Sequence, residues 1–410
     1  MQEGYMDLTK QRYLRLASAS LIMICIGIIY MWSVFGGFVI REFGWSTADS
    51  ALTASIMVAC FSLGGLIGGR IQDRIGPKPV VIVAAISFFG GIFLSSFAVS
   101  KGPFALYLCF GVLGGFSVGC IYNSTMACIQ KWFPDKINVS MGVIVTFFGL
   151  ATVVFSPIVT VIANAVGIET TFQIIAGIFL VLCLVGSIMI KNPPQDWKPD
   201  GFERRKAGLP QKQYTFKEAL KTRQLWILFL AVWFITAGFF TFNPILKQLA
   251  LARGLDESLS TVIVMITGLG MACGRMLFPL VVNRIGRKNT AMVLAVVVLA
   301  TSCGLIFAQG YLFLVLIILA AATAGAPGAI WPTWTTENFG LANIGAIYGF
   351  VLLGIGISSL ISFTVANGIA KAAAGGADFV YFIIAAVMAV LTIALIALFK
   401  PVNNKEEKSV

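Results

Sequence analysis

Residues 261–288 read TVIVMITGLGMACGRMLFPLVVNRIGRK, and this stretch decides which fold class the chain can adopt. About twenty of these residues are apolar or small, which is enough to cross a lipid bilayer as a helix. Arg275 interrupts them, and in a helix it would lie about 12 Å from the basic turn at residues 284–288. A guanidinium at that depth costs about 2.5–3.5 kcal/mol, so it needs a partner or a water-filled cavity.

The composition extends this interpretation to the whole chain. Of the 410 residues, 58% are hydrophobic and 11% are charged, and long apolar runs recur throughout. Such a chain is predicted to be an all-α membrane protein, because backbone groups inside a bilayer must be bonded within each helix. We expect twelve transmembrane helices, near residues 16–39, 51–69, 80–100, 103–129, 138–163, 171–190, 224–246, 259–282, 290–309, 311–333, 345–370 and 379–399.

Most of the 29 lysines and arginines fall in every second predicted connection. The connections on the other side hold only Arg41, Lys101, Lys247, Arg253 and Lys371. By the positive-inside rule the basic side faces the cytoplasm, and both termini lie there. The net charge of +12 is thereby interpreted as an orientation signal, and no nucleic-acid partner is expected.

The sequence offers little material for catalysis or metal binding. It contains no histidine, and its eight cysteines fall inside predicted helices without the spacing of a metal site or a disulfide framework. No nucleophile–base pair or cluster of metal ligands can be recognised. We therefore expect no enzymatic activity, no cofactor and no metal.

An internal repeat indicates how the helices are grouped. The polar stretch at residues 191–223 separates six predicted helices from six, and we expect a cytoplasmic linker with a short amphipathic helix near residues 216–221. RIGPK at residues 74–78 returns 210 residues later as RIGRK. The chain is thus predicted to form two six-helix pseudo-symmetric bundles, residues 1–190 and 224–410. Parallel repeats of this kind are typical of transporters with a midplane site between the halves.

Residues 69–78, GRIQDRIGPK, resemble the signature that the major facilitator superfamily carries between its second and third helices. The resemblance implies the twelve-helix fold of that superfamily. It also implies that Asp73, Arg74 and Gly76 belong to a cytoplasmic gate, in which charges attract across the two bundles and the glycine permits a tight turn.

The second copy of this signature departs from the family pattern. Pro279 and Asn283 replace the usual glycine and aspartate. We therefore expect Arg284 to belong to a weaker lock in the second half. Tyr348, at the start of the eleventh predicted helix, is also assigned to the gate.

Three further stretches are similar to the oxalate:formate antiporter family within that superfamily: residues 30–35 (YMWSVF), 131–136 (KWFPDK) and 331–350. Arg275 stands where that family has its anion-binding arginine. The resemblance implies a multi-pass protein of a bacterial inner membrane that transports small carboxylates.

The departures from that family bear on the cargo. Ile355 stands where the family's dicarboxylate transporter has a second cation, a lysine. The aromatic residues that enclose oxalate correspond to Ala324, Gly328 and Leu352. One cation in a roomier pocket argues against oxalate. It favours a monocarboxylate such as lactate or pyruvate, as in the lactate-type members of the family.

Arg275 has no evident acidic partner, because no aspartate or glutamate lies well inside a predicted helix. A substrate carboxylate could supply the missing charge through two parallel hydrogen bonds to the guanidinium. The alternative is that Arg275 bonds backbone carbonyls or extends toward the cytoplasm. We expect the substrate role.

Four other residues are candidates for the same substrate-binding site. Tyr122 and Asn123 could bond to carboxylate or hydroxyl oxygens, although an interhelical hydrogen bond explains the asparagine equally well. Tyr30 is expected to line the pocket. Trp331 would cap the site or belong to the core of its bundle.

These observations predict a monomeric secondary transporter that carries a small carboxylate anion by alternating access. The sequence leaves proton symport, exchange for a counter-anion and facilitated diffusion open. Oxalate/formate-type anion exchange is the alternative assignment. Drug efflux is less favoured because the fifth helix lacks a glycine–proline series, and a sensor because neither the linker nor the tail is large enough for an output domain.

Overall fold

The computed structural model describes residues 2–194, 197–199, 202, 210, 212–372 and 378–402, and every regular element in these ranges is helical. The first part of the chain forms α1 (Gln2–Ile26), η1 (Gly27–Tyr30), α2 (Trp32–Phe43), α3 (Thr47–Ile75), α4 (Pro77–Ala98), η2 (Val99–Lys101), α5 (Pro103–Leu106), η3 (Tyr107–Gly114), α6 (Gly115–Trp132) and α7 (Ile137–Met189). The second part forms α8 (Phe216–Leu220), α9 (Arg223–Phe240), η4 (Asn243–Ile245), α10 (Leu246–Ala252), α11 (Glu257–Ile285), α12 (Arg287–Phe307), α13 (Gly310–Gly325), α14 (Pro327–Phe339), α15 (Ile344–Ala372) and α16 (Phe379–Ala397).

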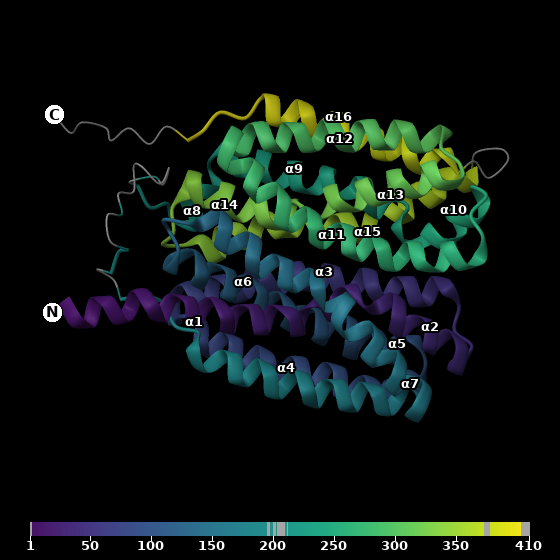
Figure 1. The fold of residues 1–410 in the computed structure, drawn as a ribbon, viewed down its shortest axis with the longest axis horizontal. Helices are drawn as coiled ribbons and strands as arrows, with labels where there is room; N and C mark the ends of the chain where they lie inside the picture. The colour runs from purple at the N-terminus through teal and green to yellow at the C-terminus, as the bar shows by residue number, and fades with distance from the viewer. Residues whose placement is uncertain are drawn as a thin grey trace.

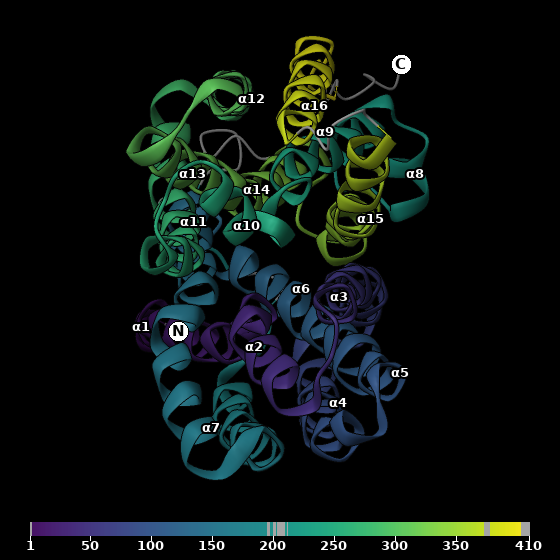
Figure 2. The ribbon, with the colours of Figure 1, turned by 90° about the vertical axis from the view of Figure 1, so that its right-hand side faces the viewer.

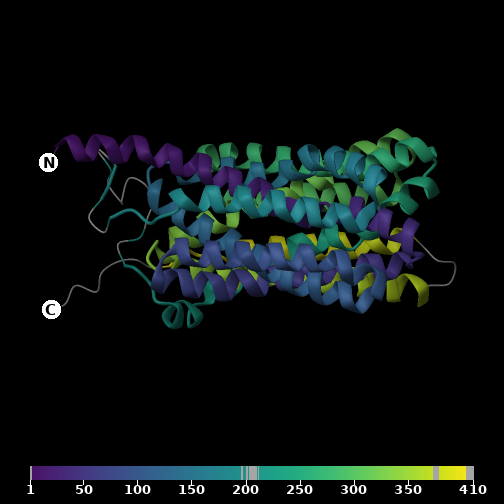
Figure 3. The same ribbon diagram turned by 90° about the horizontal axis from the view of Figure 1, so that it is seen from below.

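The helices separate into two groups, which we call the N-terminal half (α1–α7) and the C-terminal half (α9–α16). Figure 2 shows the first group below the second, with a boundary across the middle of the molecule. The long helices run along the long axis, and α1 begins and α16 ends toward the same end (Figures 1 and 3). We call this the terminal end and the opposite one the far end.

Helix α7 makes two crossings of the bundle. It runs for 53 residues, and Gly167 (φ 79°, ψ 167°) breaks its helical backbone. At the terminal end, Trp132 of α6 donates a 2.6 Å hydrogen bond to the carbonyl of Lys191, just beyond the last residue of α7. At the far end, Glu42 accepts a hydrogen bond from the N–H of Ile168, beside the bend. The eleven apolar helices in the described part of the chain therefore make twelve crossings, which confirms the predicted number.

The first and seventh crossings each contain a 3-10 turn between two α-helices, whereas the sequence pattern predicts continuous helices near residues 16–39 and 224–246. The tenth, predicted near 311–333, is divided at Ala326 into α13 and α14. The first crossing consists of α1, the 3-10 turn η1 and α2, with non-helical backbone at Met31 (φ −92°, ψ 0°). The seventh consists of α9, η4 and α10, and Pro244 in η4 has no N–H to continue the helix. In transporters, broken helices of this kind occur at the midplane site, and Tyr30 lies at the first break.

The two halves meet along two helix pairs, α3 with α15 and α7 with α11. Glycines permit the first pair to approach closely. A Cβ at Gly69 would collide with the carbonyl oxygen of Gly345, and a Cβ at Gly349 would lie 2.7 Å from the carbonyl oxygen of Gly65. Small residues at such contacts allow the van der Waals packing that holds helices together in a bilayer. The second pair brings α11, which carries Arg275, against the N-terminal half.

The described residues of the linker, 191–194, 197–199, 202, 210 and 212–223, lie at the terminal end and contact both halves. Its first part packs on the N-terminal half, where the rings of Trp197 and Trp132 are 4.8 Å apart. Its second part contacts the C-terminal half, where the N–H of Tyr214 donates a 3.0 Å hydrogen bond to the carbonyl of Phe339. The short helix predicted in the linker is confirmed as α8.

Candidate functional site

A cavity of about 350 Å³ lies between the two halves and reaches from Arg275 to the far end. We call it the outer cavity. Its wall in the N-terminal half comes from η1, α2, α3 and α7, and its wall in the C-terminal half comes mainly from α9, η4, α10 and α11. It extends to Thr47 and Lys247, which are exposed at the far end. Many lining side chains carry hydroxyl or amide groups: Ser33, Thr47, Ser50, Ser55, Thr152, Ser156, Asn243, Thr267 and Ser359.

Arg275 lies at the inner end of this cavity and is only 3% exposed. Its guanidinium carbon is 4.6 Å from the centre of the Tyr30 ring and 5.6 Å from that of Phe148, both within the range of a cation–π contact. Its Nε is buried without a hydrogen-bond partner, and no ion pair between described residues includes it. The aromatic faces compensate part of the charge, but they leave the directional N–H groups without a carboxylate.

The position of the guanidinium depends on two close backbone contacts. Gly274 lies against α13, and a Cβ there would overlap the carbonyl oxygen of Ala322. On the other side, a Cβ at Gly149 of α7 would come within 2.5 Å of Nη1 of Arg275. The two glycines therefore create the space that the arginine side chain occupies between the halves.

A second, smaller cavity of about 50 Å³ shares Arg275, Tyr30 and Met271 with the outer one and extends toward the terminal end. We call it the inner cavity. Its polar side chains are few: Arg275, Tyr30, Tyr122 and Thr236. The rest of its wall is apolar or glycine: Ile29, Val58, Phe61, Val145, Phe148, Phe239, Phe240, Met271, Ala324, Gly325, Pro327, Gly328, Leu352 and Ile355. Arg275 is thus the only charged residue among the described residues that line it.

The structure brings three of the five predicted binding residues together. Arg275, Tyr30 and Tyr122 all line the inner cavity, and the Tyr122 hydroxyl lies 3.5 Å from the carbonyl oxygen of Gly328. The four positions that the family resemblance relates to the oxalate pocket also line it: Ala324, Gly328, Leu352 and Ile355.

The other two predicted binding residues lie elsewhere in this conformation. The Asn123 amide donates 2.7 Å hydrogen bonds to the carbonyls of Gly65 and Gly345, so it joins α6 to α3 and across the interface to α15. Trp331 is fully buried, and its Nε1 donates a 3.0 Å hydrogen bond to the carbonyl of Leu228 in α9. These contacts agree with an interhelical hydrogen bond for Asn123 and a core position for Trp331. A contact with cargo stays a prediction for both residues.

Asp73 lies in the α3–α15 contact at the terminal end. Its carboxylate accepts hydrogen bonds from the N–H groups of Gly345 (3.3 Å) and Ala346 (2.7 Å), in the first turn of α15. Lys131 lies 3.8 Å from the same carboxylate. A helix N-terminus has unpaired N–H groups and a partial positive charge, so an aspartate from the opposite half binds it well.

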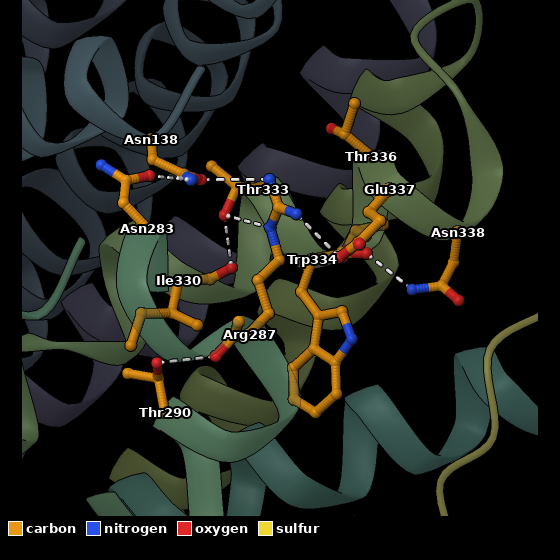
Figure 4. A network of polar contacts seen from close by, with 12 residues as sticks. Asn138, Asn283, Arg287, Thr290, Ile330, Thr333, Trp334, Thr336, Glu337 and Asn338 are labelled. Atoms are coloured by element: carbon orange, nitrogen blue, oxygen red, sulfur yellow. Dashed lines mark hydrogen bonds and ion pairs between the residues drawn. The ribbon is translucent and has the colours of Figure 1, made fainter. Parts of the chain in front are cut away.

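The α7–α11 contact at the terminal end is closed by a different set of bonds, which Figure 4 shows. Asn283 occupies the position related to Asp73 by the repeat, and it accepts a 2.7 Å hydrogen bond from Asn138 in the first turn of α7. Arg287 donates a 3.0 Å hydrogen bond to the Asn138 side chain and forms a 2.8 Å ion pair with Glu337. At the position related to Asp73, a neutral amide contact thus replaces the charged one, and Arg287 adds a charge-assisted hydrogen bond between the halves.

The remaining predicted gate residues lie at the surface, in a turn or inside the interface between the halves. Arg74 and Arg284 are exposed at the ends of α3 and α11. Gly76 (φ 89°) and Gly286 (φ 79°) occupy the same left-handed backbone region at the following turns, as the repeat predicts. Tyr348 is only 1% exposed and lies near Tyr122, inside the interface.

Sequence reasoning did not identify several residues of the site and gate. Phe148 and Gly149 surround Arg275 from α7, and no local motif marks them. Arg287, which belongs to the same repeated turn as the predicted gate residue Arg284, forms the ion pair with Glu337. The repeat relates Asn283 to Asp73, but its offset of 210 residues does not say that Asn283 meets Asn138 of α7.

Comparison with known proteins identifies related sequences over most of the chain. The model of the Major Facilitator Superfamily matches residues 17–363 and 228–410. The uncharacterized MFS-type transporter YhjX of Escherichia coli is 27% identical over 86% of both chains. The oxalate:formate antiporter of Oxalobacter formigenes is 26% identical over 83% of this chain and 80% of its own. Monocarboxylate transporter 13 of Rattus norvegicus is 27% identical over 40% and 38% of the two chains.

Solved structures share the arrangement of helices. The transporter FucP in its outward conformation matches with a TM-score of 0.72 at 15% identity, covering 94% of this chain and 99% of its own. The human organic anion transporter MFSD10 matches with a TM-score of 0.68 at 15% identity, covering 95% and 98% of the two chains. At these identities the similarity concerns the fold alone.

Proposed function

This chain belongs to the Major Facilitator Superfamily and is a secondary transporter, and from that premise we propose that its cargo is a small monocarboxylate bound by Arg275. The single observation that carries the proposal is the state of this arginine. It is almost completely buried at the meeting point of both cavities, and its Nε has no partner. A carboxylate can accept two parallel hydrogen bonds from a guanidinium and neutralise its charge at the same time.

The lining of the inner cavity supports one carboxylate and not two. Arg275 is the only cation among its described lining residues, and Ile355, Leu352 and Ala324 form apolar surface around it. A second carboxylate would lie against that surface without a partner, which costs several kcal/mol. A short carbon chain, as in pyruvate or lactate, suits it better. Tyr30 and Tyr122 offer hydroxyls for a keto or hydroxyl oxygen, and we keep both as proposed binding residues.

Oxalate/formate-type exchange remains the second candidate. It is favoured by the similarity to the oxalate:formate antiporter over most of both chains. Formate would fit the single cation as a monocarboxylate, whereas oxalate would have to present its second carboxylate to an apolar wall.

The proposed mechanism is alternating access between two six-helix domains, residues 1–190 and 224–410, joined by the linker at 191–223. In this conformation the outer cavity is open at the far end, while Asp73 and Asn283 belong to contacts that close the terminal end. An anion on Arg275 would neutralise a buried charge, so occupied and empty proteins would differ in the cost of closing around the site. We infer that the terminal end is cytoplasmic, in a bacterial inner membrane, with Arg74, Gly76, Arg284 and Tyr348 acting at that gate.

Uptake by the purified protein in proteoliposomes tests the cargo. Labelled lactate, pyruvate, formate, acetate and oxalate would be offered singly, with and without a pH gradient and with unlabelled anion inside. We expect uptake of lactate or pyruvate and none of oxalate. Rapid oxalate uptake with the other acids ignored would favour the second candidate. If none of the five is transported or raises the thermal midpoint of the protein, the carboxylate assignment is wrong.

Replacing Ile355 with lysine should change the charge preference of the site. The new ammonium would enter the wall of the inner cavity, which Arg275 also lines. A charge-assisted hydrogen bond contributes about 1.5–3 kcal/mol, so we expect oxalate to bind at least about tenfold more tightly than to the parent protein. Isothermal titration with oxalate and pyruvate measures both affinities. Ile355→Met, which adds no charge, is the control. A folded Ile355→Lys protein with unchanged oxalate affinity would mean that this position does not face the cargo.

A further inference from the structure

Two hydroxyl groups in the wall of the outer cavity are buried without a hydrogen-bond partner among the described residues. They belong to Thr152 and Ser156 of α7, and Ser156 is only 5% exposed. Buried polar groups in proteins are nearly always hydrogen-bonded, because leaving one unpaired in an apolar environment is costly. Each of these hydroxyls therefore keeps one donor and two acceptor lone pairs available for a molecule in the cavity.

Other hydroxyls of α7 are satisfied by the helix itself. Thr146, Thr160 and Thr171 donate hydrogen bonds of 2.7, 2.8 and 2.6 Å to the backbone carbonyl four residues earlier. Serine and threonine side chains inside a helix commonly bond in this way. None of these three threonines lines the outer cavity. The buried, unbonded hydroxyls of α7 are thus found where the helix faces the cavity.

The two hydroxyls lie in line with Arg275. Thr152 and Ser156 follow Gly149 by three and seven residues, so all three share one face of α7, and this face lines the outer cavity. A Cβ at Gly149 would come within 2.5 Å of Nη1 of Arg275, which places the guanidinium beside this glycine. Thr152 therefore lies about 4.5 Å farther along the helix axis toward the far end, and Ser156 about 10 Å farther.

The gap between α7 and α11 has room beside Thr152. The Thr152 side chain faces Gly268 of α11, where a Cβ would lie 3.6 Å from its Cγ2, and glycine leaves this space open. The outer cavity is the one that opens at the far end, whereas Tyr122 lines only the inner cavity. A carboxylate that reaches Arg275 from the open side therefore has its carbon chain beside Thr152.

We propose that Thr152 and Ser156 form a subsite for an oxygen atom on the carbon chain of the cargo, a role that rests on the proposed carboxylate function. With the carboxylate on Arg275, the Thr152 hydroxyl bonds a hydroxyl or keto oxygen on the neighbouring carbon, and Ser156 extends the polar surface one turn farther out. An unsubstituted acid leaves both hydroxyls buried and unpaired. A site built to hydrogen-bond a substrate hydroxyl discriminates against the analogue that lacks it. The cargo class is thereby narrowed to 2-hydroxy and 2-oxo monocarboxylates.

Isothermal titration of the purified full-length protein with L-lactate and with propionate tests the subsite. The two acids share a three-carbon chain, and only lactate carries the hydroxyl. We expect the parent protein to bind lactate about tenfold more tightly than propionate. In Thr152→Val, which keeps the shape of the side chain, lactate affinity should fall about three- to tenfold and propionate affinity should not, since one neutral hydrogen bond is lost. In the double variant Thr152→Val/Ser156→Ala the preference for lactate should be close to absent.

Thr146→Val supplies the matched control on the same helix. The Thr146 hydroxyl bonds the carbonyl of Gly142, and the residue lines neither cavity, so this variant should prefer lactate as strongly as the parent protein does. The thermal midpoint of the ligand-free protein checks folding. Because Thr152→Val removes an unpaired buried hydroxyl, its midpoint should be equal to that of the parent or higher.

Three results would overturn the subsite: an unchanged preference in the double variant, an equal loss of affinity for both acids, or a parent protein that binds propionate as tightly as lactate. The proposed carboxylate function is compatible with each of them. A parent protein that binds neither acid would instead count against the proposed function.

Discussion

Replacing Arg275 with glutamine is expected to weaken monocarboxylate binding by about a hundredfold and to stabilise the empty protein at the same time. The loss of affinity follows from removing a charge-assisted, two-fold hydrogen bond, about 3 kcal/mol. The gain in stability follows because the guanidinium is 3% exposed, with its Nε unpaired, and a neutral amide costs less to bury. Thermal unfolding with and without pyruvate measures both effects, and the shift that ligand produces in the parent should be absent in the variant.

A fall in pyruvate affinity together with a rise in the thermal midpoint distinguishes an arginine that binds cargo from one that supports the fold. Arg253 offers the matched control, since its guanidinium donates hydrogen bonds of 3.0 and 3.2 Å to the carbonyls of Ile306 and Ala308. Arg253→Gln should lower the thermal midpoint and leave pyruvate affinity intact. If Arg275→Gln also lowers the midpoint and keeps its affinity, Arg275 supports the helix packing and the cargo assignment fails.

Replacing Asp73 with asparagine is expected to open the terminal end. The carboxylate accepts hydrogen bonds from the first turn of α15 and lies 3.8 Å from Lys131, and asparagine removes the charge from both contacts. We estimate a loss of about 2 kcal/mol for the closed state, which is about a 30-fold shift between closed and open populations. Spin labels at Lys136 and Ile285, exposed on opposite halves, report the distance between α7 and α11 in a cysteine-free background.

The repeat supplies a control for this second change. Asn283→Ala removes the related contact in the other helix pair, a neutral hydrogen bond to Asn138 worth about 1 kcal/mol. It should shift the label distances in the same direction but less than Asp73→Asn does. Equal distance distributions in Asp73→Asn and the parent would show that the bond to α15 does not hold the terminal end closed.

The fold could be predicted from the sequence because membrane helices obey few constraints. Length and apolarity were sufficient for twelve crossings, and the repeated RIGxK turn matches glycines with similar positive φ in both halves. The interruptions near Met31 and Pro244 were missed, since a run of apolar residues has the same appearance whether its helix is continuous or broken. Pro244 was an available signal for the second break.

At the site, the sequence predicts which residue carries the charge, but it does not predict which side chains that residue contacts. Arg275 could be singled out because a lone cation in an apolar segment is costly wherever its helix packs. Tyr30 and Tyr122 reach the same cavity, as expected from their depth. Asn123 lies at a similar depth but its amide bonds carbonyls of α3 and α15, because the face of a helix that meets the cargo depends on the packing of other helices. The cation–π contact with Phe148 likewise arises only in three dimensions.

The single cation deep in the cavity wall has a consequence for energy coupling. Among the described lining residues of both cavities there is no carboxylate and no imidazole, so these walls hold no acidic side chain that could carry a proton alongside the anion. If the anion crosses alone, each cycle moves one negative charge, and a potential of 100 mV contributes about 2.3 kcal/mol, equivalent to a gradient of about fiftyfold. Net flux would then respond to voltage and, in a cell with a negative interior, run outward. One-for-one exchange of two monovalent anions moves no net charge and would be indifferent to it.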